Sequence, residues 1–247
     1  MNYPRLDEWL VSAGHYPTRA RARDAIKRGC VTMSGSASIK PSRSVIDPST
    51  VQVKDAAKRL VSRAALKLEH ALEHTGWTPA NLVALDIGAS TGGFCQVLLN
   101  NGAKHVFGVD VGHDQMDERI KNDKRVTNIE GLNARSLTLD DLGGIAPEFI
   151  TSDVSFISLK LALPPALEVA ASGAKGIFLI KPQFEVGRDL LGKGGIVRDQ
   201  AIAKECADDL MRWLNAVDGW RGTHLLSSPV TGGDGNTEFL MAGEKDG

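Results

Sequence analysis

Short apolar runs alternate with helical stretches from about residue 60 to the end of the chain. The apolar runs are bounded by Gly, Pro, Asn or Asp and predict strands over residues 82–87, 105–111, 126–130, 149–152, 177–180, 219–226 and 237–242. Apolar residues at helical spacing predict helices over 63–75, 92–100, 161–171 and 200–216. Strand and helix alternate until the last two strands, which follow each other directly. This order predicts a doubly wound α/β sheet with right-handed crossovers.

One predicted strand ends in a charged residue. Gly176 precedes four hydrophobic residues, and Lys181-Pro182 follows them, which is typical of a strand buried on both faces of a parallel sheet. Because proline cannot donate to the sheet ladder, the strand should end at Lys181. Ligands of open α/β sheets bind at the carboxyl ends of the strands. Lys181 is therefore a candidate base, and the alternative is a lysine that extends into solvent.

The first 60 residues have a different pattern, which predicts a small α+β domain. Helical spacing predicts helices over 5–13 and 19–27, and Thr18 can cap the second. Short strands are expected at 30–33 and after Val45. Residues 47–57 are expected to form a linker. We therefore expect a small domain with its linker at 1–58 and a larger domain at 59–247.

Charge is distributed unevenly between these two parts. The chain has a net charge of −1, but residues 1–60 carry eleven Lys and Arg against five Asp and Glu, a balance of +6. The remaining residues carry eighteen against twenty-five, a balance of −7. A compact basic domain indicates a polyanionic partner.

Other features limit the possible classes of protein. Hydrophobic residues make up 42% of the chain, and no window approaches the ~18 consecutive apolar residues of a transmembrane helix. The first residues lack a secretory signal. Cys30, Cys95 and Cys206 are widely spaced and predict neither a disulfide framework nor a metal site. We expect a cytoplasmic protein without a metal, and the oligomeric state is open.

A glycine-rich loop follows the first strand of the larger domain. It reads Asp86-Ile-Gly88-Ala-Ser90-Thr-Gly92-Gly93-Phe94, and neither the dinucleotide-binding nor the P-loop spacing is present. Asp86 would repel a pyrophosphate but suits a cationic or amino-acid group. Asp110 ends the second strand, where a carboxylate can hold ribose hydroxyls. The two acids and the loop fit S-adenosylmethionine better than NAD, and the alternative is a purely structural turn.

Three more polar residues accompany Lys181. Asp153 ends the fourth strand, so it should face the same crevice as Lys181. Lys67 lies on the helix before the sheet, and Glu238 begins the last strand. Taken singly, Asp153 could be a helix cap, Lys67 a solvated helix residue and Glu238 a surface carboxylate.

The small domain resembles the S4 RNA-binding domain. The resemblance covers about residues 3–50 and rests on Arg5-Leu6-Asp7-x-x-Leu10, Gly14, the run from Thr18-Arg19 to Gly29-x-Val31, Gly35 and Lys40-Pro41-Ser42. It implies a module that binds structured RNA through a basic helix. The residues expected to contact RNA there are Arg5, Arg19, Arg21, Arg23, Lys27, Arg28, Lys40 and Arg43.

The larger domain resembles the FtsJ-type ribose 2′-O-methyltransferases, and the whole chain resembles the TlyA family, also called hemolysin A-like. The motifs are Val61-Ser-Arg-x-x-Leu-Lys-Leu68, the glycine loop, Val109-Asp-Val-Gly112, Asp153-Val-Ser-Phe-Ile-Ser158, Lys181-Pro-Gln-Phe-Glu-Val-Gly187 and Gly235-Asn-x-Glu-Phe239. The resemblance implies a Rossmann-like S-adenosylmethionine-dependent methyltransferase that acts on the ribose 2′-hydroxyl of ribosomal RNA or ribosomal subunits, with cytidine as the expected target.

The same resemblance implies roles for particular residues. Lys67, Asp153, Lys181 and Glu238 are the expected catalytic residues, and Asp86, Gly88, Ser90, Gly92, Gly93, Phe94, Asp110 and Asn133 are expected to bind the cofactor. Residues 185–199 are expected to form a mobile basic lid in which Arg188 and Lys193 contact RNA. The chain departs from the family at Ala64-Ala65, where two glycines are usual, and at Leu132, where threonine is usual.

Other chemistries fit the sequence less well. Amino-group methylation of a base would need Asn/Asp-Pro-Pro-Tyr/Phe where Asp153-Val-Ser-Phe156 stands. Carbon-5 methylation would need a cysteine after proline, and Cys95 is expected to be a small buried hydrophobic residue. Two other classes stay open: an RNA-docking assembly factor with an inactive methyltransferase fold, and a hemolysin-like protein. The intact set of four polar residues argues against the first, and the lack of an amphipathic segment argues against the second.

Overall fold

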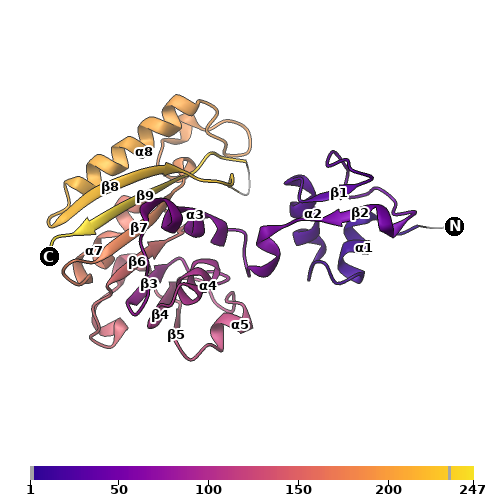
Figure 1. The fold of residues 1–247 in the computed structure, drawn as a ribbon. Coiled ribbons are helices and arrows are strands. Elements are labelled where there is room, and N and C mark those ends of the chain that lie inside the picture. Colours follow the sequence, from indigo (N-terminus) through magenta and orange to yellow (C-terminus); the bar gives the residue numbers. More distant parts are fainter. Residues whose placement is uncertain (1–2, 233–234) are drawn as a thin grey trace. The chain divides into compact units, whose positions relative to one another are not determined.

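Two units make up the computed structural model, which describes residues 3–232 and 235–247 (Figure 1). The chain divides between Leu60 and Val61, two residues beyond the boundary expected from the sequence. We call the part up to Leu60 the head and the part from Val61 the body.

The head contains two helices and a two-stranded sheet. Its elements are α1 (Leu6–Ser12), α2 (Arg19–Lys27), β1 (Val31–Met33), β2 (Val51–Val53) and the 3-10 turns η1 (Pro48–Thr50) and η2 (Ala56–Arg59). The Thr18 hydroxyl caps α2 by accepting from the Arg21 N–H. Leu6, Leu10, Ala22 and Ile26 form its core with Val31 and neighbouring residues.

The prediction of a linker over residues 47–57 was wrong. Val51 and Val53 form β2, which pairs antiparallel with β1 through Met33 and Val31. Asp55, which follows β2, accepts hydrogen bonds from Tyr16 and Arg28 at 2.9 Å. These residues therefore complete the head, because a lone strand β1 would leave its backbone groups without a partner.

A mixed seven-stranded sheet forms the centre of the body. Its strands are β3 (Val83–Ile87), β4 (His105–Asp110), β5 (Val126–Glu130), β6 (Phe149–Ser152), β7 (Lys175–Ile180), β8 (Trp220–Ser227) and β9 (Phe239–Lys245). The spatial order is β5-β4-β3-β6-β7-β9-β8, and β9 runs antiparallel to both of its neighbours. The predicted α/β class is confirmed, and the last two strands make the sheet mixed.

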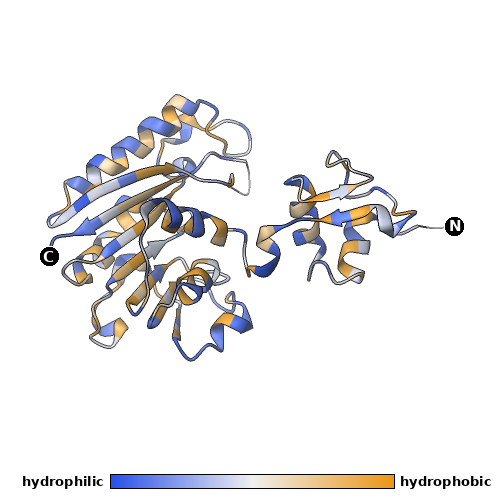
Figure 2. Ribbon diagram, in the orientation of Figure 1, coloured by the Kyte–Doolittle hydropathy of each residue, from blue (hydrophilic) through white to orange (hydrophobic). Residues whose placement is uncertain are grey.

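Helices cover the sheet. They are α3 (Ala65–Thr75), α4 (Gly93–Asn100), α5 (Glu118–Lys121), α6 (Leu159–Ala162), α7 (Pro164–Val169) and α8 (Gln200–Asn215). Figure 2 shows that hydrophobic residues gather on the central strands, and that α8 carries both hydrophobic and hydrophilic residues along its length. On α8 the buried residues include Cys206, Leu210 and Leu214, as expected of a helix packed on a sheet.

The single helix predicted over 161–171 is two short helices. α6 begins at Leu159 behind a Ser158 cap, and α7 begins at Pro164. Pro164 and Pro165 cannot donate backbone hydrogen bonds, so they are compatible with a helix start and incompatible with a helix interior.

The strand order places four strand ends side by side. β3, β4, β6 and β7 are parallel neighbours, so their carboxyl ends meet at one edge of the sheet. The order reverses between β3 and β6. Ligands of open α/β sheets bind in the crevice at such a point.

Candidate active site

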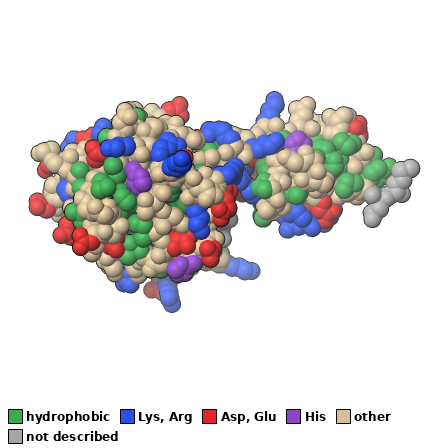
Figure 3. Space-filling view, turned by 90° about the horizontal axis from the view of Figure 1, so that it is seen from below, with side chains coloured by type: hydrophobic (Ala, Val, Ile, Leu, Met, Phe, Trp, Pro, Cys, Tyr) green, Lys and Arg blue, Asp and Glu red, His purple; other side chains and the backbone are tan. Residues whose placement is uncertain are grey.

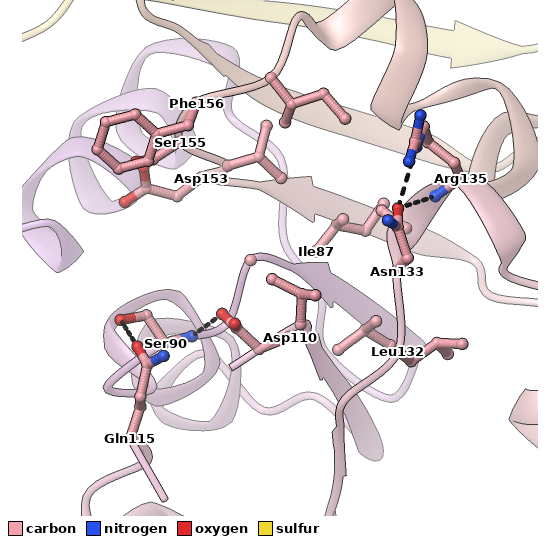
Figure 4. A pocket seen from close by; sticks show the side chains of 16 residues that line it. Ile87, Ser90, Asp110, Gln115, Leu132, Asn133, Arg135, Asp153, Ser155 and Phe156 are labelled. Atoms are coloured by element: carbon pink, nitrogen blue, oxygen red, sulfur yellow. Dashed lines mark hydrogen bonds between the residues drawn. The ribbon is translucent and has the colours of Figure 1, made fainter. Parts of the chain in front are cut away.

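A cavity of about 470 Å³ opens at this edge. Its walls come from the segments that follow β3, β4 and β6, together with residues 132–135 (Figure 4). In Figure 4, Ser90 and Asp110 lie on one side of the cavity, while Asp153, Ser155 and Phe156 lie on another. The cavity therefore joins the glycine loop to the loop that carries Asp153.

Gly88 lets the backbones of these two loops approach each other closely. Its φ is +79°, and a Cβ at this position would lie 2.9 Å from the carbonyl oxygen of Asp153. No side chain fits there without a shift of the backbone. The glycine loop and the Asp153 loop thus meet at the floor of the cavity.

Asp110 is fixed by backbone donors. Its Oδ2 accepts from the Ser90 N–H at 2.8 Å, and its Oδ1 accepts from the Gly112 N–H at 2.7 Å. Each carboxylate oxygen has a further lone pair. The Ser90 hydroxyl donates to Gln115 at 3.0 Å, so the side chains at this wall are held in place.

Asp86 lies below the glycine loop and is fully buried. Its carboxylate accepts from the Cys95 thiol at 3.1 Å and from the Thr151 hydroxyl at 2.9 Å. Burial raises the pKa of Asp86 to about 7, and these hydrogen bonds only partly oppose the shift. Asp86 lines a small adjacent cavity of about 60 Å³ instead of the large one.

The remaining residues expected to bind a cofactor are distributed over both cavities. Asn133 lines the large cavity, and its side chain caps a 3-10 turn by accepting from the Arg135 N–H. Gly93 and Phe94 line the small cavity. Gly92 lines neither and is the N-cap of α4, with a φ of +82°, where a Cβ would collide with Ile120.

Lys181 is held at the rim of the large cavity by two partners on the neighbouring loop. Its Nζ lies 2.7 Å from Asp153 Oδ1 and donates to the Ser155 hydroxyl at 2.8 Å. Asp153 and Ser155 both line the cavity. The two charges expected at adjacent strand ends do meet.

Lys67 and Glu238 form a second ion pair. Lys67 Nζ on α3 lies 2.5 Å from Glu238 Oε2, and the side chains are only 7% and 3% exposed. The register pairs Ile180 of β7 with Phe239 of β9. Lys181 and Glu238 are therefore the next residues along adjacent strands, which places the two ion pairs at the same sheet edge.

Three contacts join the loops after β6 and β7, and two of them were not expected from the sequence. Besides the Lys181 pair, the ring of Phe156 packs on Phe184 at 4.9 Å. Glu185 accepts from the Ser158 hydroxyl at 2.6 Å and from the Leu159 N–H at 2.8 Å. Burial raises the pKa of Glu185. These contacts fix the segment that carries Asp153 and Ser155.

Ser155 and Phe156 belong to this site although neither was expected from the sequence, and Phe156 is the more unusual of the two. Its side chain is 90% exposed at the cavity wall, and its φ of +64° is unusual for a bulky residue. Such strained positions cluster at functional sites. The motif Asp153-Val-Ser-Phe156 was the available signal, but a sequence does not reveal exposure.

The expected lid is tied to the loop before β9. Asn236 accepts from the Val197 N–H at 2.9 Å and donates to the Gly195 carbonyl at 3.1 Å. Arg188 and Lys193 are exposed on this segment. The basic segment is thus anchored two residues from Glu238.

The eight head residues expected to contact RNA fall into three groups. Arg5, Arg19 and Arg23 surround Asp7. Lys27, Lys40 and Arg43 are exposed, and Figure 3 shows Lys and Arg side chains on the head surface. The other two have structural contacts: Arg21 donates to the carbonyls of Ala57 and Leu60, and Arg28 pairs with Asp24 and Asp55.

Neither a metal cluster nor a membrane-spanning helix is found among the described residues. Over residues 3–232 and 235–247, no group of three or more His, Cys, Asp and Glu side chains is arranged to hold a metal ion. Within the same ranges no helix is both long and apolar enough to cross a membrane.

The chain is similar to known methyltransferases. The family described as FtsJ-like methyltransferase matches residues 60–245. YqxC of Bacillus subtilis, named as a candidate rRNA methyltransferase, is 42% identical over 96% of this chain and 84% of that protein. The 16S/23S rRNA (cytidine-2′-O)-methyltransferase TlyA of Mycobacterium tuberculosis is 38% identical over 96% of this chain and 88% of that protein.

A solved structure is similar over both units. It is described as a hemolysin candidate from Streptococcus thermophilus, has a TM-score of 0.77 and 38% identity, and covers 100% of this chain and 90% of that one.

Proposed function

Because the chain belongs to the FtsJ-like methyltransferase family and to its TlyA branch, we propose that it methylates the 2′-hydroxyl of a cytidine ribose in ribosomal RNA. The observation that carries the proposal is the Lys181–Asp153 ion pair at the rim of the large cavity. S-adenosylmethionine is the methyl donor of this family's reaction.

The cavity fits S-adenosylmethionine. Because Gly88 has no Cβ, the glycine loop lies against the backbone of Asp153, and both loops line the same cavity. Asp110 keeps free lone pairs for ribose hydroxyls, and Ser90 and Asn133 line the same space. Asp86 beside the small cavity suits the amino group of the methionine part. When bound, the cofactor supplies an electrophilic methyl group on its sulfonium.

Lys181 is the residue we assign to the reacting hydroxyl. A ribose hydroxyl is a poor nucleophile, so a group must withdraw its proton or stabilise the developing alkoxide. Lys181 Nζ is held by Asp153 and Ser155 at the cavity wall. Asp153 orients it and balances its charge. Lys67, fixed by Glu238, would position the hydroxyl from the neighbouring pair.

The exposed basic residues are proposed to dock the RNA. They lie on the head at Lys27, Lys40 and Arg43, and on the body at Arg188 and Lys193. Phe156 offers an exposed ring beside the Lys181 pair on which the target base can stack. Arg21 donates to the Leu60 carbonyl and Arg28 pairs with Asp55, which favours a structural role for both arginines.

Labelled-methyl transfer to ribosomal subunits tests the proposal. We expect transfer by the wild type and a loss of at least about 100-fold in Lys181→Ala, the range for a positioned acid or base. Lys124→Ala, which removes an exposed lysine before β5, serves as the control. Product mapped to a base, or full transfer by Lys181→Ala, would contradict the proposal.

The same experiment distinguishes the alternatives. RNA binding by the wild type without transfer would indicate a docking factor with an inactive methyltransferase fold. The two intact ion pairs favour the enzyme instead. Hemolysin is a name that relatives carry, among them the solved structure and hemolysin A of Brachyspira hyodysenteriae, and no observation among the described residues of the body favours it for this chain.

A further inference from the structure

Three arginines of the head converge on one buried carboxylate. Asp7 is 0% exposed, and its oxygens lie 3.0 Å from Arg5 Nε, 3.1 Å from an Arg19 terminal nitrogen and 2.7 Å from Arg23 Nε. Arg19 also contacts Glu8 at 2.9 Å. Burial alone would raise the pKa of Asp7, but the hydrogen bonds from Arg5, Arg23 and Arg19 outweigh it and hold the pKa well below its usual range. Asp7 is therefore ionised at every physiological pH.

The arginines keep donors for a further partner. Their side chains are 41%, 45% and 47% exposed, and each guanidinium has five N–H donors. Arg23 uses its Nε for Asp7, which leaves its terminal nitrogens free to bind phosphate oxygens in pairs. The carboxylate also offsets the repulsion among three like charges held close together.

Other basic residues lie next to this cluster. The Leu6 N–H donates to the Arg43 carbonyl at 2.7 Å, and the Asp7 N–H donates to the Pro41 carbonyl at 3.0 Å. The exposed segment from Lys40 to Arg43 therefore borders the start of α1. The half-exposed arginines and the segment that carries the exposed Lys40 and Arg43 therefore lie on neighbouring parts of the head.

We propose that Asp7 is a positioning residue that holds Arg5, Arg19 and Arg23 as one preformed site for RNA phosphate groups. This inference rests on the proposed function, since it assumes that the head binds ribosomal RNA. Free arginine side chains lose conformational freedom when they bind. Arginines already held by Asp7 lose less, so an acidic residue strengthens binding to a polyanion.

The proposal has the opposite sign from simple electrostatics. If only net charge mattered, Asp7→Asn would bind RNA more tightly, because it removes a negative charge from the binding surface. If Asp7 positions the arginines, Asp7→Asn should bind on the order of ten-fold more weakly, about 1.4 kcal/mol. It should also show a smaller salt dependence, because fewer phosphates are contacted.

Filter binding tests this prediction. The full chain is titrated against unmodified 16S and 23S rRNA transcripts over a series of KCl concentrations. Asp47→Asn is the control with the same charge change, since Asp47 is an exposed head carboxylate whose side chain contacts Ser49. It should bind as tightly as the wild type or more tightly. Circular dichroism melting checks that Asp7→Asn is folded.

A second variant keeps the proposal testable if Asp7→Asn does not fold. Arg23→Gln leaves Asp7 paired with Arg5 and Arg19, and we expect it to bind RNA about five-fold more weakly than the wild type. Lys54→Gln is the control, because it removes an exposed head cation outside the cluster, and its loss of RNA affinity should be smaller. Tighter binding by folded Asp7→Asn, or unchanged binding by Arg23→Gln, would overturn the inference. Wild type that binds neither RNA would instead refute RNA docking by the head.

Discussion

Removing either partner of the Lys67–Glu238 ion pair alone should lower the free energy of unfolding of the body. The charges lie 2.5 Å apart with side chains 7% and 3% exposed, so each depends on the other for compensation. We consider Lys67→Met, Glu238→Leu and the double variant. The single variants leave one buried charge without its partner, and the double variant leaves none.

The expected magnitude follows from that burial. Breaking a buried pair on one side costs about 3–5 kcal/mol, whereas replacing both charges with apolar residues is often neutral or stabilising. For a unit of the body's size, each kcal/mol shifts the melting temperature by about 2–4 °C. The single variants should therefore melt roughly 6–20 °C lower, and the double variant should lie near the wild type.

Scanning calorimetry of the body's transition measures these shifts, and labelled-methyl transfer measures function in parallel. We expect the double variant to be folded and inactive, which would show that the pair is kept for its chemistry. Glu244→Gln is the control, because its pair with Arg221 is exposed and should be worth at most about 1 kcal/mol. Single variants that shift no more than this control would refute the reasoning.

Three further predictions concern the cavity. Because burial raises the pKa of Asp86 to about 7, its contribution to stability is fully present below about pH 4 and is lost as the pH rises to about 7. Denaturant unfolding should therefore show wild type losing stability between about pH 4 and 7 relative to Asp86→Asn, and parallel pH curves would contradict this. Gly88→Ala places a Cβ 2.9 Å from the Asp153 carbonyl at a φ of +79°, so we expect loss of S-adenosylmethionine binding in calorimetric titration and a loss of roughly 1–3 kcal/mol in the free energy of unfolding. Wild-type affinity would show that the close approach of the Gly88 and Asp153 backbones does not shape the cavity. Glu185→Ala removes the acceptor of Ser158 and Leu159, so turnover should fall about ten-fold or more through misplacement of the Asp153 loop. Unchanged turnover in labelled-methyl transfer would show that Glu185 does not hold this loop.

Much of the body could be predicted from local sequence patterns. Strand β7 is apolar from Ile177 to Ile180 and ends at Lys181-Pro182, so both its burial and its end are encoded within a few residues. Asp110 and Gly88 were likewise found from their places after strands. Parallel strands must place such ends at one edge, which is why the Lys181–Asp153 contact followed from order alone.

Other features depend on partners far away in the sequence. The sequence pattern predicts a linker where β2 lies, because a strand of three residues carries little signal until it pairs with β1. The Lys67–Glu238 contact spans 171 positions. Its burial depends on α3, which packs against β9, and β9 lies between β7 and β8 in the sheet. The exposure of Phe156 at the cavity wall also has no local signature.

The α/β class, the glycine loop and the charges at the strand ends are encoded in short stretches of sequence, because periodicity and chain order act over short distances. The pairing of those charges, and the hold of Asp7 on particular arginines of the head, depend on how separate elements pack. Pairing and burial are properties of side chains brought together from separate elements. The same residue types therefore serve as structural contacts at Arg28 and as the proposed binding groups at Arg23.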